Sequence, residues 1–268
     1  MPLAFSTLGC PGMTLSSVVE IAADQGYDGV ELRAGPDEPV HTGLDGPQRQ
    51  LVSRQLTAAG VAALSVASYV RVCDPDADDD GIVSAGLAHA RLAHDVGASY
   101  LRVFPGGQRA PGATDADDLR GARRLAQIIA ASAGLGVRVA LETHDSHGRA
   151  ADVRRIIDQP GCAEAVVIWD VLHSWLGAED PAASFDLLAD RLAYVQIKDV
   201  VSRADLTPRP PATGALPLAE VAAAIRDRGS GGWLSWEYER AWHPREPSLA
   251  TLAPGVRRWV QSQRLLPS

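Results

Sequence analysis

Carboxylates, one amide and several histidines follow short apolar stretches in the second half of the sequence. These stretches end in LETH (141–144), WDVLH (169–173), QIKD (196–199) and WEYE (236–239). If Glu142, Asp170, Gln196 and Glu237 meet at one place, three carboxylates and an amide oxygen converge, and such a cluster is costly to desolvate without a cation. A divalent ion would neutralise it. Hard oxygen donors suit Mn²⁺ or Mg²⁺, with Co²⁺ as a further candidate, better than a zinc site rich in His and Cys.

The chemistry of such a centre can be stated from the residue types alone. A divalent ion in contact with a carbonyl and a neighbouring hydroxyl of a substrate acidifies the C–H bond between them, because it stabilises the enediolate. A flanking carboxylate then removes the proton. Return of the proton to the opposite face epimerises the carbon, return at the neighbouring carbon isomerises the substrate, and loss of a β-hydroxyl dehydrates it. The residues indicate the shared first step and leave the outcome open.

Residues near the same stretch ends are candidates for contact with a substrate. Lys198 is the only lysine among 25 strongly basic residues, and strand alternation places it on the face of Gln196. It suggests a compact ammonium for which arginine is no substitute, and a salt bridge to Asp199 is the structural alternative. Three further candidates are His144, His173 and Arg102.

The elements that must position these residues alternate regularly along the chain. Strands are expected at 3–8, 29–33, 63–69, 100–104, 138–144, 166–170, 194–199 and 233–239. Between them apolar residues recur at helical spacing, and Gly26, Gly60, Gly97 and Gly136 end four helical patterns shortly before a strand.

Eight strand–helix units predict a closed (β/α)₈ TIM barrel of the α/β class, in which polar residues at the C-terminal strand ends form the active site. An open doubly wound sheet is the alternative. The turn at 8–12 lacks the glycine-rich phosphate motif of that fold.

Composition narrows the class of partner. The chain is 46% apolar and carries a formal net charge of −8, which disfavours binding to nucleic acid or to an anionic membrane surface. The opening residues MPLAFSTLGCPGMTLSS lack the basic and apolar regions typical of a signal peptide, and no run of about 18 apolar residues occurs in the sequence. We therefore expect a cytoplasmic protein that acts on a small molecule, and the sequence leaves a homo-oligomer open.

The whole chain resembles the sugar phosphate isomerase/epimerase superfamily, the xylose isomerase-like TIM barrels. The resemblance is carried by GYDGVEL at 26–32 and by the LETH, WDVLHS, QIKD and WEYE segments. It implies that residues 1–268 form one such barrel domain and that four residues ligate the metal: Glu142, Asp170, Gln196 and Glu237.

The same resemblance implies roles for individual side chains. Glu142 and Glu237 would face each other across the substrate as acid and base, whereas His173, Lys198 and Arg203 would contact substrate oxygens. The expected substrate is a carbohydrate, a keto-sugar, a cyclic polyol or a keto acid.

Position 196 departs from the epimerase pattern, because epimerases usually have His there and this chain has Gln. Gln at this place is similar to some metal-dependent dehydratases of the 3-dehydroshikimate type. A lyase acting on such a keto acid or on an inosose is therefore the alternative to an isomerase or epimerase. Two more distant alternatives are a DNA-repair endonuclease, which the acidic charge opposes, and a sugar-binding barrel without activity.

Overall fold

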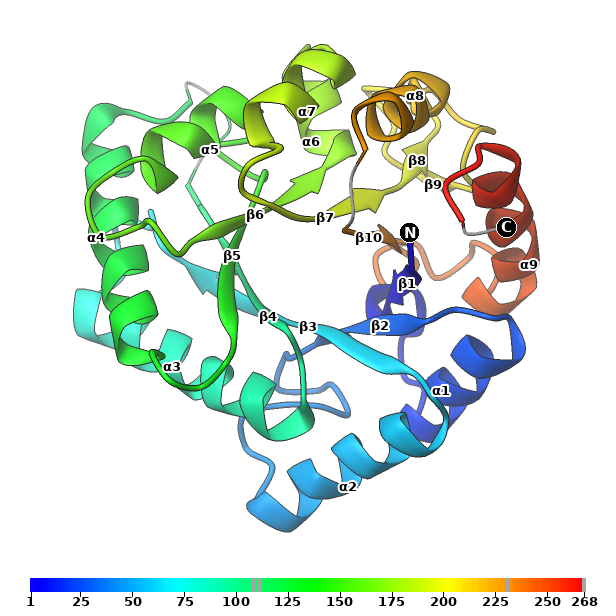
Figure 1. Ribbon diagram of the computed structural model, residues 1–268, viewed down its shortest axis with the longest axis horizontal. Helices are drawn as coiled ribbons and strands as arrows, with labels where there is room; N and C mark the ends of the chain where they lie inside the picture. The colour runs from blue at the N-terminus through cyan, green and yellow to red at the C-terminus, as the bar shows by residue number, and fades with distance from the viewer. Residues whose placement is uncertain (108, 110–111, 230–231, 267–268) are drawn as a thin grey trace.

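The computed structural model describes residues 1–107, 109, 112–229 and 232–266. Eight parallel strands form a closed barrel in the order β1-β10-β7-β6-β5-β4-β3-β2, and helices surround it (Figure 1). The strands are β1 (Leu3–Ser6), β2 (Gly29–Arg33), β3 (Ala62–Arg71), β4 (Tyr100–Phe104), β5 (Arg138–Glu142), β6 (Val166–Asp170), β7 (Leu192–Ile197) and β10 (Trp233–Trp236). The predicted (β/α)₈ TIM barrel is confirmed.

The helices fall in the intervals between the strands. They are η1 (Thr7–Gly9), α1 (Leu15–Asp24), α2 (Gly46–Ala58), α3 (Asp79–Val96), α4 (Asp115–Ala131), α5 (Ala150–Ile157), α6 (Val171–Leu176), α7 (Pro181–Leu188), α8 (Leu218–Arg228) and α9 (Leu249–Ser262). The four glycines expected to end helical patterns all have positive φ, for example 80° at Gly97, the C-cap of α3. No helix of the described residues is long and apolar enough to cross a membrane.

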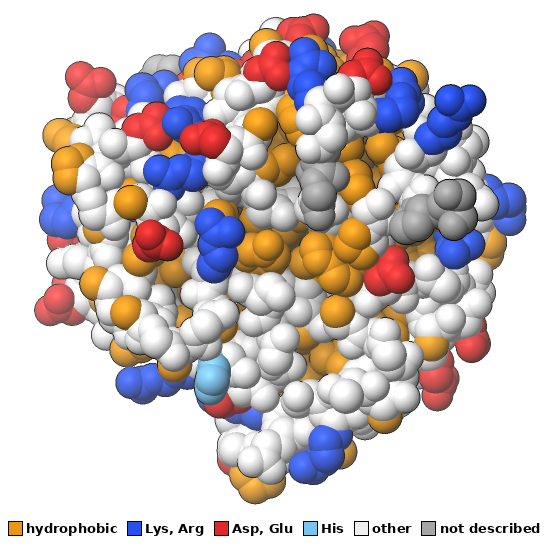
Figure 2. Space-filling view, viewed as in Figure 1, with side chains coloured by type: hydrophobic (Ala, Val, Ile, Leu, Met, Phe, Trp, Pro, Cys, Tyr) orange, Lys and Arg blue, Asp and Glu red, His pale blue; other side chains and the backbone are white. Residues whose placement is uncertain are grey.

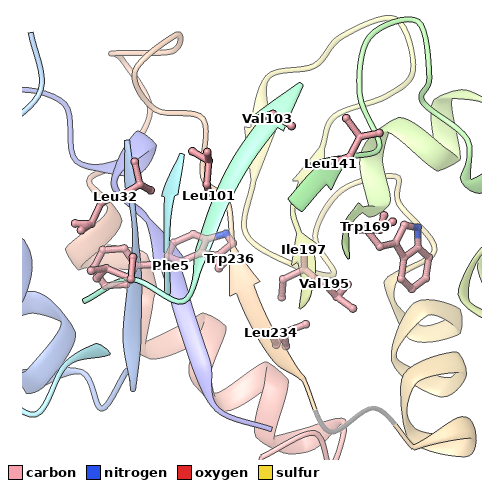
Figure 3. Close-up of a cluster of buried hydrophobic side chains, with 14 of the residues drawn as sticks. Phe5, Leu32, Leu101, Val103, Leu141, Trp169, Val195, Ile197, Leu234 and Trp236 are labelled. Carbon is pink, nitrogen blue, oxygen red and sulfur yellow. The ribbon is translucent and has the colours of Figure 1, made fainter. Parts of the chain in front are cut away.

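Strand alternation separates the core into two layers. Outward side chains such as Phe5, Leu32 and Trp169 pack with the apolar faces of the helices, and Figure 3 labels ten side chains of this outer layer. Inward side chains form a smaller cluster that includes Leu64, Ile168 and Tyr194. The barrel interior is therefore apolar in this part, and the polar residues at the strand ends lie on the same inward face.

The N-terminal end of the chain is held against its C-terminal part. The Met1 ammonium donates to the Leu265 carbonyl at 2.7 Å, so the start of β1 lies beside the segment that follows α9 (Figure 1). Figure 2, in the same view, shows hydrophobic side chains gathered over the centre of the barrel and most charged side chains around the periphery.

The connection after β7 contains structure that the sequence did not predict. Two short strands, β8 (Asp199–Val200) and β9 (Pro208–Arg209), pair antiparallel. The Asp199 carboxylate accepts hydrogen bonds from the backbone N–H groups of Gly214 and Leu216 at 2.9 and 3.0 Å. Asp199 therefore pins this loop to the end of β7.

Candidate active site

The four residues predicted to ligate a metal converge inside the C-terminal end of the barrel. Glu142 ends β5, Asp170 ends β6, Gln196 lies on β7 and Glu237 directly follows β10. All four are buried, with at most 4% of each residue exposed. Period-2 alternation brings them onto the inward face, as expected.

Lys198 lies among these carboxylates. Its Nζ is 2.7 Å from Asp170 Oδ2 and 2.8 Å from Glu239 Oε1, and it also pairs with Glu237. The alternative of a salt bridge to Asp199 is not what the structure shows, since the Asp199 carboxylate binds backbone N–H groups of its own loop. The single lysine is thus an internal cation of the site.

Arg102 on β4 is the second buried cation. Its Nη1 is 3.3 Å from Glu142 Oε2 and 3.8 Å from Glu237 Oε1, while its Nη2 donates to the Ser68 carbonyl at 2.9 Å. The guanidinium also lies 4.0 Å from the centre of the Phe104 ring. Glu142 and Glu237 therefore share one fixed cation from separated strands of the barrel.

Glu31 on β2 is a further buried carboxylate of the site, and we did not single it out from the sequence. It accepts hydrogen bonds from Tyr194 Oη at 2.6 Å, from Gln196 Nε2 at 3.0 Å and from Ser235 Oγ. The sequence did contain a signal for this placement, because Glu31 lies between two apolar residues, Val30 and Leu32, and both of them pack in the outer layer. A carboxylate between them must face the barrel interior.

The donor set fits a divalent ion. Among the described residues, five carboxylates meet two cations here, so at full ionisation the cluster keeps an excess of negative charge; its carboxylates are Glu31, Glu142, Asp170, Glu237 and Glu239. Gln196 Oε1 is fully buried and has no hydrogen-bond partner in the part of the chain that the structure describes. An unpartnered amide oxygen beside an excess of carboxylates suits a hard cation, which takes oxygen ligands.

The environments of the carboxyl groups move their pKa values in different directions. Burial raises the pKa of Glu142 well above its usual range although Arg102 opposes the shift, and burial likewise raises the pKa of Asp170 against the effect of Lys198. Burial would also raise the pKa of Glu237, but Lys198 and Arg102 outweigh it and hold that pKa below its usual value. Two carboxyl groups beside the same arginine therefore have pKa values that are shifted in opposite directions.

Two histidines at the mouth form a second donor group. One donor atom each from Glu142, His144 and His173 lies within 4.8 Å of the other two, and the two imidazole rings are 3.8 Å apart. However, Arg109 Nη2 lies 2.8 Å from His173 Nδ1. Because a guanidinium can only donate, the His173 proton belongs on Nε2, which makes this ring a hydrogen-bond donor to the site and a poor metal ligand.

A cavity of about 200 Å³ opens above the buried carboxylates. Its wall includes Glu142, Glu237 and His144, and it also includes Arg102 and the 60% exposed Trp242. A larger hollow of about 600 Å³ lies beside it and reaches His173. Asp145 contributes to both walls.

Arg203, the remaining candidate for substrate contact, lines neither hollow. Its guanidinium stacks 4.2 Å from the centre of the Trp175 ring, and its Nη1 donates to the Leu176 carbonyl at 3.2 Å. A role of Arg203 in substrate contact stays a prediction.

The turn that carries His144 is held by a buried network that the sequence did not reveal. Asp145 adopts a positive φ of 46°, and its carboxylate lies 2.8 Å from His144 Nδ1. Two residues on, His147 Nδ1 lies 2.8 Å from Ser146 Oγ, and its Nε2 lies 2.8 Å from Asp118 on α4. This chain of polar contacts ties the β5–α5 turn to a neighbouring helix and fixes the position of the His144 ring.

The chain belongs to the xylose isomerase-like TIM barrel family, whose model matches residues 19–266. Among curated proteins it is similar to a putative hydroxypyruvate isomerase of Streptomyces coelicolor, with 30% identity over 107 residues. That match covers 40% of this chain and 37% of the relative, so the chain is matched to well under half of that protein.

Solved structures share the fold over almost the whole chain. The probable 3-DHS dehydratase AsbF from Bacillus anthracis has a TM-score of 0.80 at 17% identity and covers 98% of this chain and 99% of its own. D-psicose 3-epimerase with D-tagatose, from Clostridium cellulolyticum H10, has 0.81 at 13%, covering 99% of each chain. The IolI protein with a bound zinc atom has 0.79 at 15%, covering 99% and 97%. At these identities the likeness shows the fold.

Removal of the Lys198 ammonium is expected to destabilise the protein strongly. Lys198→Met leaves Asp170 and Glu237 buried without their principal cation, a change that typically costs about 3–5 kcal/mol. Urea unfolding of the metal-free protein measures this, and Arg258→Met, an exposed position on α9, should stay within about 0.5 kcal/mol of wild type. Equal stability of Lys198→Met and wild type would contradict the assigned role of the ammonium.

The buried His147 predicts part of the pH dependence of stability. Burial lowers the pKa of His147, although the contact with Asp118 opposes the shift. Below about pH 6.5, the ordinary pKa of histidine, His147 is protonated in the unfolded chain but stays neutral in the folded protein. The free energy of unfolding therefore falls as the pH drops toward the pKa of His147 in the fold. One such group contributes at most about 1.4 kcal/mol per pH unit.

His147→Gln cannot titrate, and the free energy of unfolding should therefore fall less between pH 7.5 and 5.5 than in wild type. Urea unfolding at the two pH values gives both differences. The same decrease in the variant and in wild type would show that folding does not shift the pKa of His147, and a larger decrease in the variant would show that the fold raises it.

Proposed function

We propose that this protein is a divalent-metal-dependent isomerase or epimerase that acts on a sugar, keto-sugar or cyclic polyol by proton transfer at carbon. The observation that carries the proposal is the pair Glu142 and Glu237. Both are buried, both lie within 3.8 Å of Arg102 Nη1, and their environments move their pKa values in opposite directions. Such a pair has the arrangement of a proton donor and a proton acceptor.

The metal would be held by Glu142, Asp170, Gln196 and Glu237. Support comes from the unpartnered Gln196 Oε1 and the excess of carboxylates among the described residues. A fold neighbour with a zinc atom also supports a divalent ion. When bound, the ion would supply positive charge next to the oxygen on which charge develops during proton removal.

The protein's own groups would perform the proton transfer. Glu237, whose pKa is held low by Lys198 and Arg102, would accept the proton from carbon, and Glu142 would supply a proton from the other side. The two residues come from strands that β6 and β7 separate in the barrel, so they can reach opposite faces of one carbon. Their burial keeps bulk water from competing in the exchange.

The walls of the cavity match a small polar substrate. Phe104 and Trp242 in its wall offer apolar ring surface. The His173 Nε2 proton at the neighbouring hollow and the buried Lys198 ammonium among the carboxylates would donate to substrate oxygens. Neighbours of the same fold act on small molecules, among them an epimerase complex with D-tagatose. The relative from Streptomyces coelicolor is named a putative hydroxypyruvate isomerase, which supports testing a keto acid among the substrates.

Solvent deuterium uptake tests the reaction whichever product forms. Wild-type protein with Mn²⁺ should exchange a carbon-bound proton of a ketose, an inosose, hydroxypyruvate or 3-dehydroshikimate, as followed by NMR. Glu142→Gln and Glu237→Gln keep an oxygen donor but lose proton transfer, so each should slow the exchange by about 10²–10⁴-fold. Glu220→Gln, an exposed carboxylate on α8, serves as the matched control and should exchange at the wild-type rate.

The products distinguish the reaction classes. An epimer or an isomer without loss of water supports the proposal, whereas a new enone or aromatic absorbance identifies a lyase. Near wild-type exchange in both Glu→Gln variants would refute the proton-transfer pair. Binding of these compounds without exchange would refute the enzyme assignment.

A further inference from the structure

Glu31 sits deeper in the barrel than the cavity and does not line it. It is completely buried and comes from β2, across the barrel from the strands that carry the proposed metal ligands. Its two carboxylate oxygens accept hydrogen bonds from Tyr194, Ser65, Ser235 and Gln196. All four partners are donors in these contacts, so Glu31 acts as an acceptor for a ring of groups.

One of these contacts decides which atom of Gln196 is free. The amide nitrogen Nε2 lies 3.0 and 3.3 Å from the two Glu31 oxygens and 3.5 Å from Glu237 Oε1. The amide oxygen Oε1 is left buried without a partner among the described residues. Rotation of the amide by about 180° would place Oε1 against two carboxylates, which is unfavourable because acceptors would then face acceptors.

We propose that Glu31 is a positioning residue that holds the amide of Gln196 with its oxygen toward the cation. The proposal rests on the proposed metal site. A carboxylate ligand needs no partner to orient it, because either of its oxygens can bind the cation. An amide ligand needs such a partner, because only its oxygen can bind a cation and its NH₂ group cannot. Outer carboxylates that orient a ligand typically account for about 10–100-fold in metal affinity.

Glu31 also has a purely structural alternative. Ser65 is on β3, Tyr194 on β7 and Ser235 on β10, so Glu31 on β2 connects its own strand to three others across the barrel interior. If Glu31 only connected the strands, its loss would reduce stability. Any loss of metal affinity would then be the same with Gln and with Glu at position 196. The test must therefore compare two backgrounds at position 196.

The experiment measures Mn²⁺ affinity by the EPR signal of the free ion, with wild-type protein titrated first. Glu31→Gln should weaken Mn²⁺ binding by about 10–100-fold in the wild-type background. In a Gln196→Glu background the same substitution should weaken it at least tenfold less, because a carboxylate presents an oxygen in either orientation and the amide introduced at position 31 can donate to it. In the second background the carboxyl groups at positions 31 and 196 share a proton, so the charge lost differs between the two comparisons, and Glu31→Asp, which keeps the charge, is measured in both backgrounds as the control.

Further variants guard against misfolding. Glu31→Asp keeps the charge but withdraws the carboxylate from Gln196 Nε2, so it should show the same dependence on the background if Glu31→Gln does not fold. Tyr194→Phe removes a hydrogen bond to Glu31 without touching Gln196. It should lower the melting temperature and weaken Mn²⁺ binding by less than the roughly 10–100-fold expected for loss of the ligand's own hydrogen-bond partner.

The outcomes distinguish a failure of the proposed role of Glu31 from a failure of the proposed metal site. Equal losses of affinity in the two backgrounds, with a wild-type protein that binds Mn²⁺, would overturn the role of Glu31 and leave the metal site standing. A wild-type protein that binds no Mn²⁺ would overturn the metal site and the role of Glu31 together. A loss confined to the Gln196 background would support both.

Discussion

The gathering of carboxylates inside the C-terminal end of the barrel is the constraint on which the rest of the structure depends. Carboxylates repel one another and are costly to bury, and within the described ranges they meet only Lys198 and Arg102 as internal cations. The fold must therefore bring both cations to fixed positions. In the proposed metal site a further positive charge would lie beside the buried amide oxygen of Gln196, which has no hydrogen-bond partner among the described residues.

The barrel supplies the rigidity that such a cluster needs. Outward side chains of every strand pack into one continuous apolar layer with the helices, so the inward side chains are held by a backbone that cannot easily relax. Inside, Leu64, Ile168 and Tyr194 fill the barrel below the site. The carboxylates thus lie directly above a layer of mostly apolar side chains. This layer excludes water, and charge interactions are strong in such surroundings.

Much of this arrangement could be predicted from the sequence because it follows from periodicity. The alternation of apolar stretches indicated the eight strands, and the period of two placed Glu142, Asp170 and Gln196 on the inward face. Strand ends were less predictable: the expected strand at 138–144 stops at Glu142 because the chain turns back, and His144 and His147 pair across that turn.

Contacts between distant segments could not be predicted in the same way. Lys198 was expected near Gln196, but its pairing with Asp170 and Glu239 depends on how three strands meet. Glu31 was overlooked because its partners come from β3, β7 and β10, far away in the sequence. The network at His147 likewise joins a turn to a helix 29 residues earlier, which no local pattern indicates.

The central claim is that one divalent ion belongs between the strand-end oxygens. Anomalous diffraction from crystals grown with Mn²⁺ tests it most directly. The account predicts a single strong peak about 2.0–2.6 Å from oxygens of Glu142, Asp170, Gln196 and Glu237, with Lys198 displaced from at least one of its carboxylates. Absence of a peak at this position, or a peak between His144 and His173 instead, would contradict it.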